Sequence, residues 1–180
     1  MNETREEKVL REATVCFLVR GSKVLLALKT DKIGKGKRNG YGGGVEFGET
    51  IVACALRELY EETGGVVAKA NDLEKIAVVH FHNTKSDGTS FVCTVHFFVV
   101  HDWLGEPQAT IEMSDPQWFD VSGLPLDDMM PADRQWLPQA LAGQKLIATA
   151  YLGPYQEHTL GDVEITYADS FFDERTASDV

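Results

Sequence analysis

The chain has 180 residues, of which 43% are apolar and 25% are charged, as is typical of a globular protein with one hydrophobic core. Its formal charge of −11 argues against broad binding to nucleic acid, which requires a positively charged surface, so no nucleic-acid partner is expected. The charge does not exclude a small anionic substrate, because a bound cation can reverse the local field.

The three cysteines predict a reducing environment. Cys16, Cys54 and Cys93 are widely spaced and form no C-x-x-C pair, and an odd number of thiols fits a compartment without disulfides. The N-terminus is charged and the apolar run after it is short, so we expect neither a secretory signal nor a membrane span. A cytoplasmic location follows from these observations, whereas the oligomeric state stays unknown.

The first half of the chain predicts two strands, a glycine-rich loop and a helix. The strands are expected at residues 13–20 and 23–28, where apolar residues predominate. Residues 34–48 contain seven glycines, so we expect a functional or disordered loop there and no regular element. Residues 50–63 lack glycine and proline and predict a helix that ends at Gly64.

The second half predicts further strands and one more helix. The strands are expected at 75–82, 91–100, around Trp118-Phe119, at 145–152 and at 157–167. The helix is expected from Pro131, a residue suited to a first turn, to Leu141. Strands mixed with two helices predict an α/β fold with a central mixed sheet. We expect a single domain over residues 1–168 and a polar tail over residues 169–180.

Three glutamates crowd one side of the first predicted helix. With Arg57, they fall within an arc of roughly 140°, because successive helical residues step by about 100°; they are Glu58, Glu61 and Glu62. Carboxylates placed so close repel one another, and a divalent cation would offset that repulsion. The alternative is a solvated acidic face, but the preceding glycine loop and the apolar residues elsewhere on the helix favour a metal site.

The segment GGVEFGETIVACALRELYEETGG, residues 43–65, resembles the Nudix box, G-x5-E-x7-R-E-U-x-E-E-x-G-U, in which U is a bulky apolar residue. The matching positions are Gly43, Glu49, Arg57, Glu58, Leu59, Glu61, Glu62 and Gly64. The one departure is Gly65 at the final apolar position, where we expect a local stability cost and no loss of catalysis.

The resemblance implies the α/β/α sandwich of Nudix hydrolases and hydrolysis of a nucleoside diphosphate linked to another moiety. The metal ligands that it implies are Glu58, Glu61, Glu62 and the backbone carbonyl of Gly42. Arg57 would orient Glu61, and Glu49 would support the glycine-rich loop. Mg²⁺ is the expected cofactor, with Mn²⁺ as the alternative, and a carboxylate not fully used by the metal would remove the proton of the attacking water.

Two further segments, KIGKGKRNGYGGGV and MMPADRQWLPQAL, are similar to those of the Nudix enzymes that hydrolyse oxidised purine nucleoside triphosphates, the MutT homologues. That similarity implies cleavage of substrates such as 8-oxo-dGTP to monophosphate and pyrophosphate. It matches Glu112 to an additional metal-binding and catalytic glutamate, for which a plain surface residue is the alternative. The substrate-binding residues that it implies are Thr14, Lys29, Asn39, Tyr41, Gly43, Gly44, Met130 and Asp133.

Two positions depart from this pattern. Ala132 replaces one of two aspartates that read the purine edge, and Met130 replaces a tryptophan that stacks on the base. Loss of a base–aromatic contact can cost roughly 1–3 kcal/mol, by analogy with single-strand stacking, and methionine can recover part of it through its sulfur. Asp133 alone still offers a carboxylate to a guanine edge. Normal and oxidised purines therefore both remain candidate substrates.

Two alternatives stay open. The first is a Nudix pyrophosphatase that acts on another nucleotide, such as a dinucleoside polyphosphate, a nucleotide sugar or a capped RNA end. The second is a non-catalytic nucleotide-binding module. A module of that kind is expected to lack carboxylates of the box, and this chain retains all of them.

Overall fold

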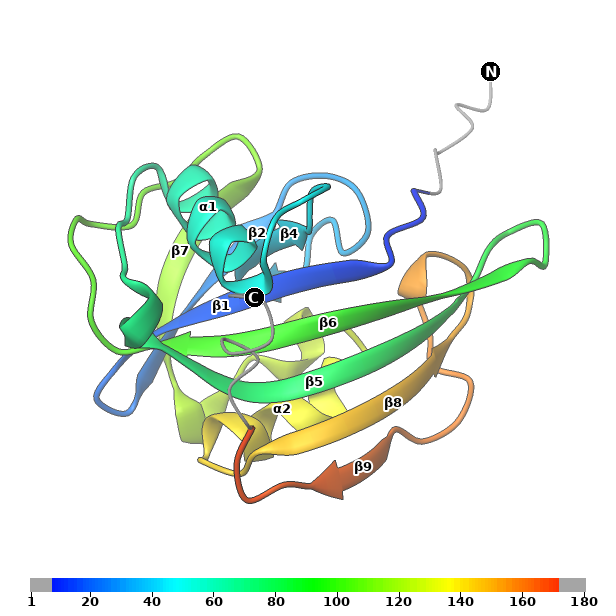
Figure 1. Cartoon of the computed structure of the whole chain (residues 1–180). Helices are drawn as coiled ribbons and strands as arrows, with labels where there is room; N and C mark the ends of the chain where they lie inside the picture. Colours follow the sequence, from blue (N-terminus) through cyan, green and yellow to red (C-terminus); the bar gives the residue numbers. More distant parts are fainter. Residues whose placement is uncertain (1–7, 172–180) are drawn as a thin grey trace.

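The structure, a computed structural model, describes residues 8–171. Within these residues, nine strands form a mixed sheet, and α1 (Ile51–Thr63) and α2 (Asp133–Leu141) pack on its opposite faces (Figure 1). The predicted α/β/α sandwich with a central mixed sheet is therefore confirmed. None of the helices in this part of the chain is long and apolar enough to cross a membrane.

The main path of the sheet runs β3-β2-β1-β6-β5-β8-β9, while β4 pairs with β1 and β7 pairs with β2. The pairs β1·β6 and β5·β8 are parallel and the other pairs are antiparallel. The strands are β1 (Glu12–Arg20), β2 (Lys23–Lys29), β3 (Arg38–Asn39), β4 (Tyr41–Gly44), β5 (Leu73–Thr84), β6 (Ser90–Val100), β7 (Met113–Asp120), β8 (Leu146–Leu152) and β9 (Glu164–Tyr167). Short 3-10 helices occupy Ala70–Asp72, Val121–Gly123, Leu126–Asp128 and Pro154–Gln156.

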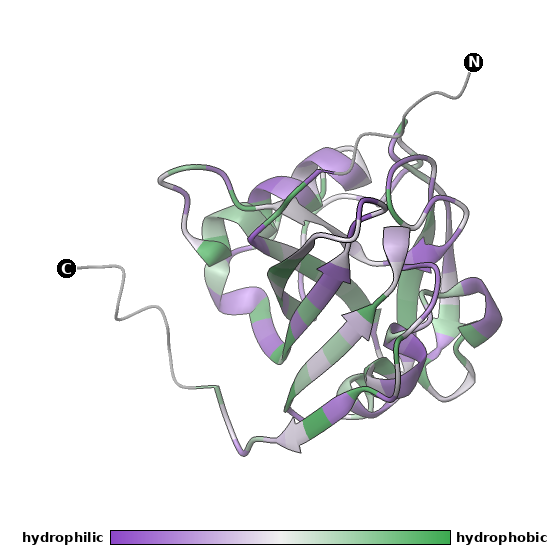
Figure 2. Cartoon of the chain, turned by 90° about the vertical axis from the view of Figure 1, so that its right-hand side faces the viewer, coloured by the Kyte–Doolittle hydropathy of each residue, from purple (hydrophilic) through white to green (hydrophobic). Residues whose placement is uncertain are grey.

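Two hydrophobic clusters stabilise the two faces of the sheet. The larger cluster joins α2, through residues such as Trp136 and Leu137, to β1, β5, β6 and β8. The smaller one joins Ala55 and Leu59 of α1 to β1, β2 and β4. Because strand side chains alternate between faces, hydrophobic and hydrophilic bands alternate along several strands (Figure 2). Each helix therefore has a fixed position over the sheet, and α1 lies over β1 and β4 (Figure 1).

The glycine-rich stretch corrects one prediction. Residues 34–48 were expected to contain no regular element, but they include β3 and β4. Gly42 lies so close to β1 that a Cβ added there would come within 1.8 Å of the carbonyl oxygen of Thr14. The glycines of β4 therefore allow a close approach between two strands and do not mark a loop.

Other boundaries differ from the predictions for identifiable reasons. The strand around Trp118-Phe119 is longer than expected, because β7 pairs with β2 from Met113 onward. The strand expected at 157–167 is confined to β9, since the chain must first reverse after β8, and it does so through a turn with Gly161 at a φ of 106°. Helix α2 begins two residues after Pro131. Most of the predicted tail, residues 172–180, lies outside the described residues.

Candidate active site

Helix α1 begins and ends at residues suited to those positions. The Thr50 side chain accepts a hydrogen bond from the backbone N–H of Ala53 at 3.1 Å, and Gly64 ends the helix with a φ of 75°. Gly65, the departure from the box, has a φ of 124°, a conformation that side chains rarely adopt. The next residue, Val66, is fully buried in the α1 cluster. Val66 therefore supplies the apolar contact that the box places one residue earlier, which argues against the loss of stability that was expected at Gly65.

Arg57 connects the carboxylates of the box. Its guanidinium donates to both oxygens of Glu49, at 2.7 and 3.0 Å, and to Glu58 at 2.7 Å. It also contacts Glu61, the residue that it was expected to orient, but at 3.4 Å and with Glu61 largely exposed. The Glu49 interaction raises the pKa of Arg57 most, and the Arg57 hydrogen bond is the main cause that lowers the pKa of Glu49. Arg57 therefore fixes Glu49 and Glu58 more firmly than Glu61.

Glu62 differs from the other box glutamates because it is buried. Its side chain lies on the packed side of α1, and the residue is 7% exposed. Its Oε2 accepts a hydrogen bond from the backbone N–H of Gly42 at 2.9 Å. Burial raises the pKa of Glu62 to about 8, and the charges of Glu58 and Glu112 act in the same direction. A cation beside this carboxylate would favour its ionised form.

The glycines of β4 bring the backbone close to these carboxylates. A Cβ added at Gly43 would lie 2.5 Å from Oε1 of Glu58, and the carbonyl of Gly44 accepts a hydrogen bond from Arg57 at 3.2 Å. Burial raises the pKa of Glu58, while Arg57 opposes that shift. Glycine at position 43 is therefore required for Glu58 to keep its place.

Glu112 joins the site from a distant part of the sequence. The loop before β7 is attached to the end of α1, because the Thr110 hydroxyl donates to the carbonyl of Glu62 at 2.9 Å. The backbone carbonyl of Glu112 accepts a hydrogen bond from the N–H of Thr30 at 3.1 Å. The Glu112 side chain is exposed, and its charge raises the pKa of both Glu58 and Glu62. Sequence reasoning missed Thr110, since a lone loop threonine belongs to no motif.

The donor set fits a divalent cation. Between residues 8 and 171, no three His, Cys, Asp or Glu side chains converge on one point where they could hold a metal ion. Glu58 and Glu62 are hydrogen-bonded to Arg57 and to the backbone of Gly42 instead. Mg²⁺ needs only one or two carboxylates together with substrate phosphates and water. Burial raises the pKa of two of the four glutamates at the site, and a bound cation would stabilise their ionised forms. The four are Glu58, Glu61, Glu62 and Glu112.

Lys29 lies between the carboxylates and the predicted base pocket. Burial lowers its pKa, and the negative charges of Glu62 and Glu112 oppose that shift. In the other direction, its positive charge lowers the pKa of Asp133. A Cβ added at Gly34 would lie 3.2 Å from both the Lys29 side chain and the sulfur of Met130. The structure therefore brings Lys29 together with Met130 and Asp133, three of the predicted substrate-binding residues.

Asp133 is a buried carboxyl group at the first residue of α2. It is 4% exposed and accepts a hydrogen bond from the indole N–H of Trp136 at 3.2 Å. Burial raises its pKa to about 7, although Trp136 and Lys29 both oppose the shift. Burial therefore favours the protonated form of Asp133, in which the carboxyl group is able to donate a hydrogen bond as well as accept one.

Two of the predicted substrate-binding residues are fully buried. Thr14 and Tyr41 are fully buried, and Thr14 contacts the Cys54 sulfur of α1 at 3.3 Å. Tyr41 packs in the α1 cluster, so neither side chain is open to a ligand in this structure, and a direct substrate contact by either residue stays a prediction. Asn39 is half-buried, with its Oδ1 accepting from the N–H of Gly40 at 2.8 Å.

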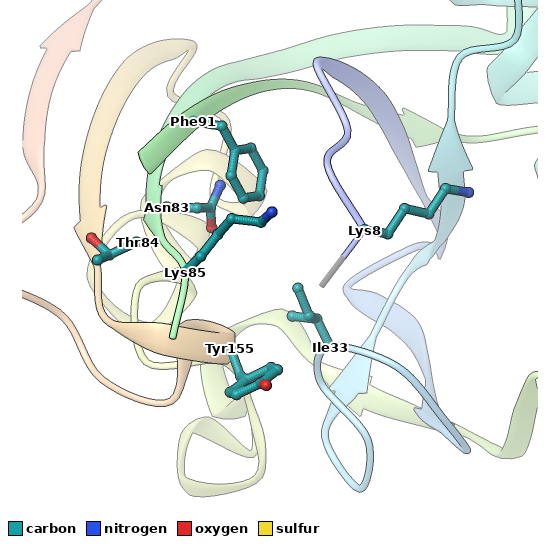
Figure 3. A pocket seen from close by; sticks show the side chains of 7 residues that line it. All are labelled: Lys8, Ile33, Asn83, Thr84, Lys85, Phe91 and Tyr155. Carbon is teal, nitrogen blue, oxygen red and sulfur yellow. The ribbon is translucent and has the colours of Figure 1, made fainter. Parts of the chain in front are cut away.

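A depression on the surface is open to solvent and is lined by residues from several segments of the chain. Ile33, which adjoins Gly34, forms one side of it, and Phe91, Lys85 and Tyr155 surround the opening (Figure 3). Asn83 is held there by Gln156, whose side-chain amide donates to it at 2.8 Å. Sequence reasoning did not single out these residues, because they come from separate loops and strands.

Comparisons with known proteins show which family the chain resembles. A family model described as NUDIX domain matches residues 9–140. The oxidized purine nucleoside triphosphate hydrolase of Danio rerio is 36% identical over 84% of this chain and 94% of its own length, and that of Mus musculus is 35% identical over 73% and 80%. A MutT protein from Bacillus halodurans has a similar crystal structure, with a TM-score of 0.69, 23% identity, and coverage of 87% of this chain and 97% of that one.

Proposed function

Because the chain belongs to the Nudix family and is a Nudix hydrolase, we propose that it hydrolyses purine nucleoside triphosphates, oxidised ones such as 8-oxo-dGTP included, to monophosphate and pyrophosphate. The relatives from Danio rerio and Mus musculus are named for oxidised purine nucleoside triphosphates, which supports this substrate class. The observation that supports it most is the position of the Lys29 side chain. Its positive charge interacts with the carboxylates of Glu62 and Glu112 and also with the carboxyl group of Asp133.

Nudix hydrolases require a divalent metal ion. We propose Mg²⁺, with Mn²⁺ as the alternative, held by the carboxylates of Glu58, Glu61, Glu62 and Glu112 and by the carbonyl of Gly42. When bound, the ion would neutralise phosphate oxygens and lower the pKa of the attacking water.

The protein groups would divide the remaining work. Arg57 holds Glu58 in place, and the Gly42 N–H holds one oxygen of Glu62. Glu61 and Glu112 are the more exposed carboxylates, so they are free to turn toward the attacking water and remove its proton. Lys29 would add positive charge beside the phosphate chain.

The base would lie against Met130, Asp133 and Asn39, with Gly43 and Gly44 near the phosphates. Met130 is 8% exposed beside Gly34, so it must turn aside to admit a base, which the flexible methionine side chain allows. Asp133 would pair with the purine edge. A cytoplasmic location stays a prediction, supported by three cysteines that are all free and buried.

A substrate panel tests the proposal. The protein would be assayed with Mg²⁺ on 8-oxo-dGTP, dGTP, dCTP, a dinucleoside tetraphosphate and a nucleotide sugar, with products separated chromatographically. The proposal predicts the highest kcat/KM for a purine nucleoside triphosphate and release of pyrophosphate. A higher kcat/KM for the dinucleotide, with two nucleotide products, would replace it with the other Nudix activity.

A further inference from the structure

Tyr41 carries a buried hydroxyl group that has no hydrogen-bond partner. The residue lies at the start of β4, is fully buried, and packs in the cluster with Leu59 of α1. Across residues 8–171, its hydroxyl oxygen is one of the very few buried side-chain polar atoms without a partner. Buried polar groups are nearly always paired, and an unpaired one destabilises the fold. Phenylalanine would fill the same space without that cost.

A carboxylate with unused hydrogen-bonding capacity lies in the same region. Gly42, the residue after Tyr41, donates its N–H to Oε2 of Glu62, and this is the one hydrogen bond formed by the Glu62 carboxylate within the described part of the chain. An ionised carboxylate can accept about four hydrogen bonds. The buried donor of Tyr41 and the under-used acceptor of Glu62 are therefore complementary.

Electrostatics supports the pairing. Burial raises the pKa of Tyr41 most, and the charge of Glu62 raises it further, so the hydroxyl keeps its proton and acts as a neutral donor. Hydrogen bonds to an ionised acceptor are stronger than neutral ones, so ionisation of Glu62 would favour this contact.

We propose that Tyr41 is a positioning residue whose hydroxyl donates a hydrogen bond to the ionised Glu62 carboxylate in the working site and fixes its orientation. In this role, Tyr41 acts through Glu62 and not through a contact with the substrate. The inference rests on the proposed function, since it takes Glu62 to be a metal-binding carboxylate.

The test compares Tyr41→Phe with Tyr60→Phe, the same chemical change at a largely exposed position of α1. Four quantities are measured: kcat and KM for the best triphosphate, the thermal midpoint without metal, and the rise of that midpoint on adding Mg²⁺. For Tyr41→Phe we expect roughly a tenfold fall in kcat, the scale of one hydrogen bond to a charged group. KM should stay within twofold, the metal-free midpoint should be unchanged or higher, and the Mg²⁺-induced rise should be smaller. Tyr60→Phe should match the wild type.

A kcat within twofold of wild type, with an unchanged Mg²⁺-induced rise, would overturn the proposal, because the hydroxyl would then be only an unpaired group. If the metal-free midpoint falls, Tyr41→Phe is also made in the Glu62→Gln variant and compared with Glu62→Gln alone. If Tyr41 acts through Glu62, the second change should not reduce the Mg²⁺-induced rise any further. An additional reduction would show that Tyr41 acts independently of Glu62. If the wild type hydrolyses no triphosphate, the proposed function fails, while the Mg²⁺-induced midpoint shift still tests Tyr41.

Discussion

The backbone N–H of Gly42 donates a hydrogen bond to the Glu62 carboxylate across 20 residues of sequence, with N and Oε2 2.9 Å apart. This bond joins β4 to the end of α1, and it partly compensates a carboxyl group that is 7% exposed. It also fixes the relative positions of Glu62 and the Gly42 backbone, both of which are proposed to bind metal. The fold itself therefore holds one part of the proposed metal site in position.

The Glu62→Gln variant should change the pH dependence of stability. Burial raises the pKa of Glu62 from 4.5 to about 8, so between these values the native state holds a proton that the unfolded state has released. The contribution of Glu62 to the stability of the metal-free protein is thus complete below about pH 4.5 and is lost as the pH rises to about 8. From pH 5 to 8, the thermal midpoint of Glu62→Gln should fall less than that of the wild type.

The same variant should have no measurable turnover, because the metal site loses a charge. In the comparison of thermal midpoints, Asp133 contributes the same pH dependence to both proteins, since its pKa is raised in each. Parallel midpoint curves for the two proteins would show that Glu62 ionises normally, and wild-type hydrolysis would remove Glu62 from the metal site.

Glu112→Gln tests the contribution of the loop before β7. The side chain is exposed and its backbone is held by Thr30, so the fold should be unaffected. If Glu112 binds metal or removes a proton, kcat should fall roughly 10²-fold or more, the scale of general acid–base contributions. A kcat within twofold of wild type would return Glu112 to the surface-residue interpretation.

Gly43→Ala should impair the site more than the fold. The added methyl group would lie 2.5 Å from Oε1 of Glu58, so that carboxylate must move away from Arg57. We expect a fall in kcat of roughly tenfold or more and a weaker Mg²⁺-induced rise in the thermal midpoint. Gly123→Ala is the matched control, since its nearest neighbour is a Cβ at 4.0 Å. Equal effects of the two changes would mean that Gly43 has no special relation to Glu58.

Asp133→Asn tests base recognition without disturbing packing. Asparagine keeps an oxygen for the Trp136 indole, whereas alanine would leave that buried N–H unpaired at a cost of roughly 1–3 kcal/mol. The variant should raise KM for guanine nucleotides roughly tenfold and leave pyrimidine nucleotides nearly unchanged, as steady-state assays can measure. Equal losses for all bases would assign Asp133 to the fold or to the chemistry.

The sequence predicted the carboxylate helix well because its information is local. Helical spacing alone places Glu58, Glu61 and Glu62 on neighbouring positions, and Gly64 ends the helix as expected. The strand β4 was missed because its glycines have low strand propensity and are explained only by the close approach of β1. The burial of Tyr41 was missed for the same reason, since tertiary pairing decides which face of a strand is covered.

The most direct test of the central proposal is product analysis of 8-oxo-dGTP incubated with the purified protein, with Mg²⁺ and with excess EDTA. Hydrolysis to the monophosphate should give equal amounts of 8-oxo-dGMP and pyrophosphate with Mg²⁺ and no products with EDTA. The nucleoside diphosphate with orthophosphate, or cleavage that persists in EDTA, would contradict it.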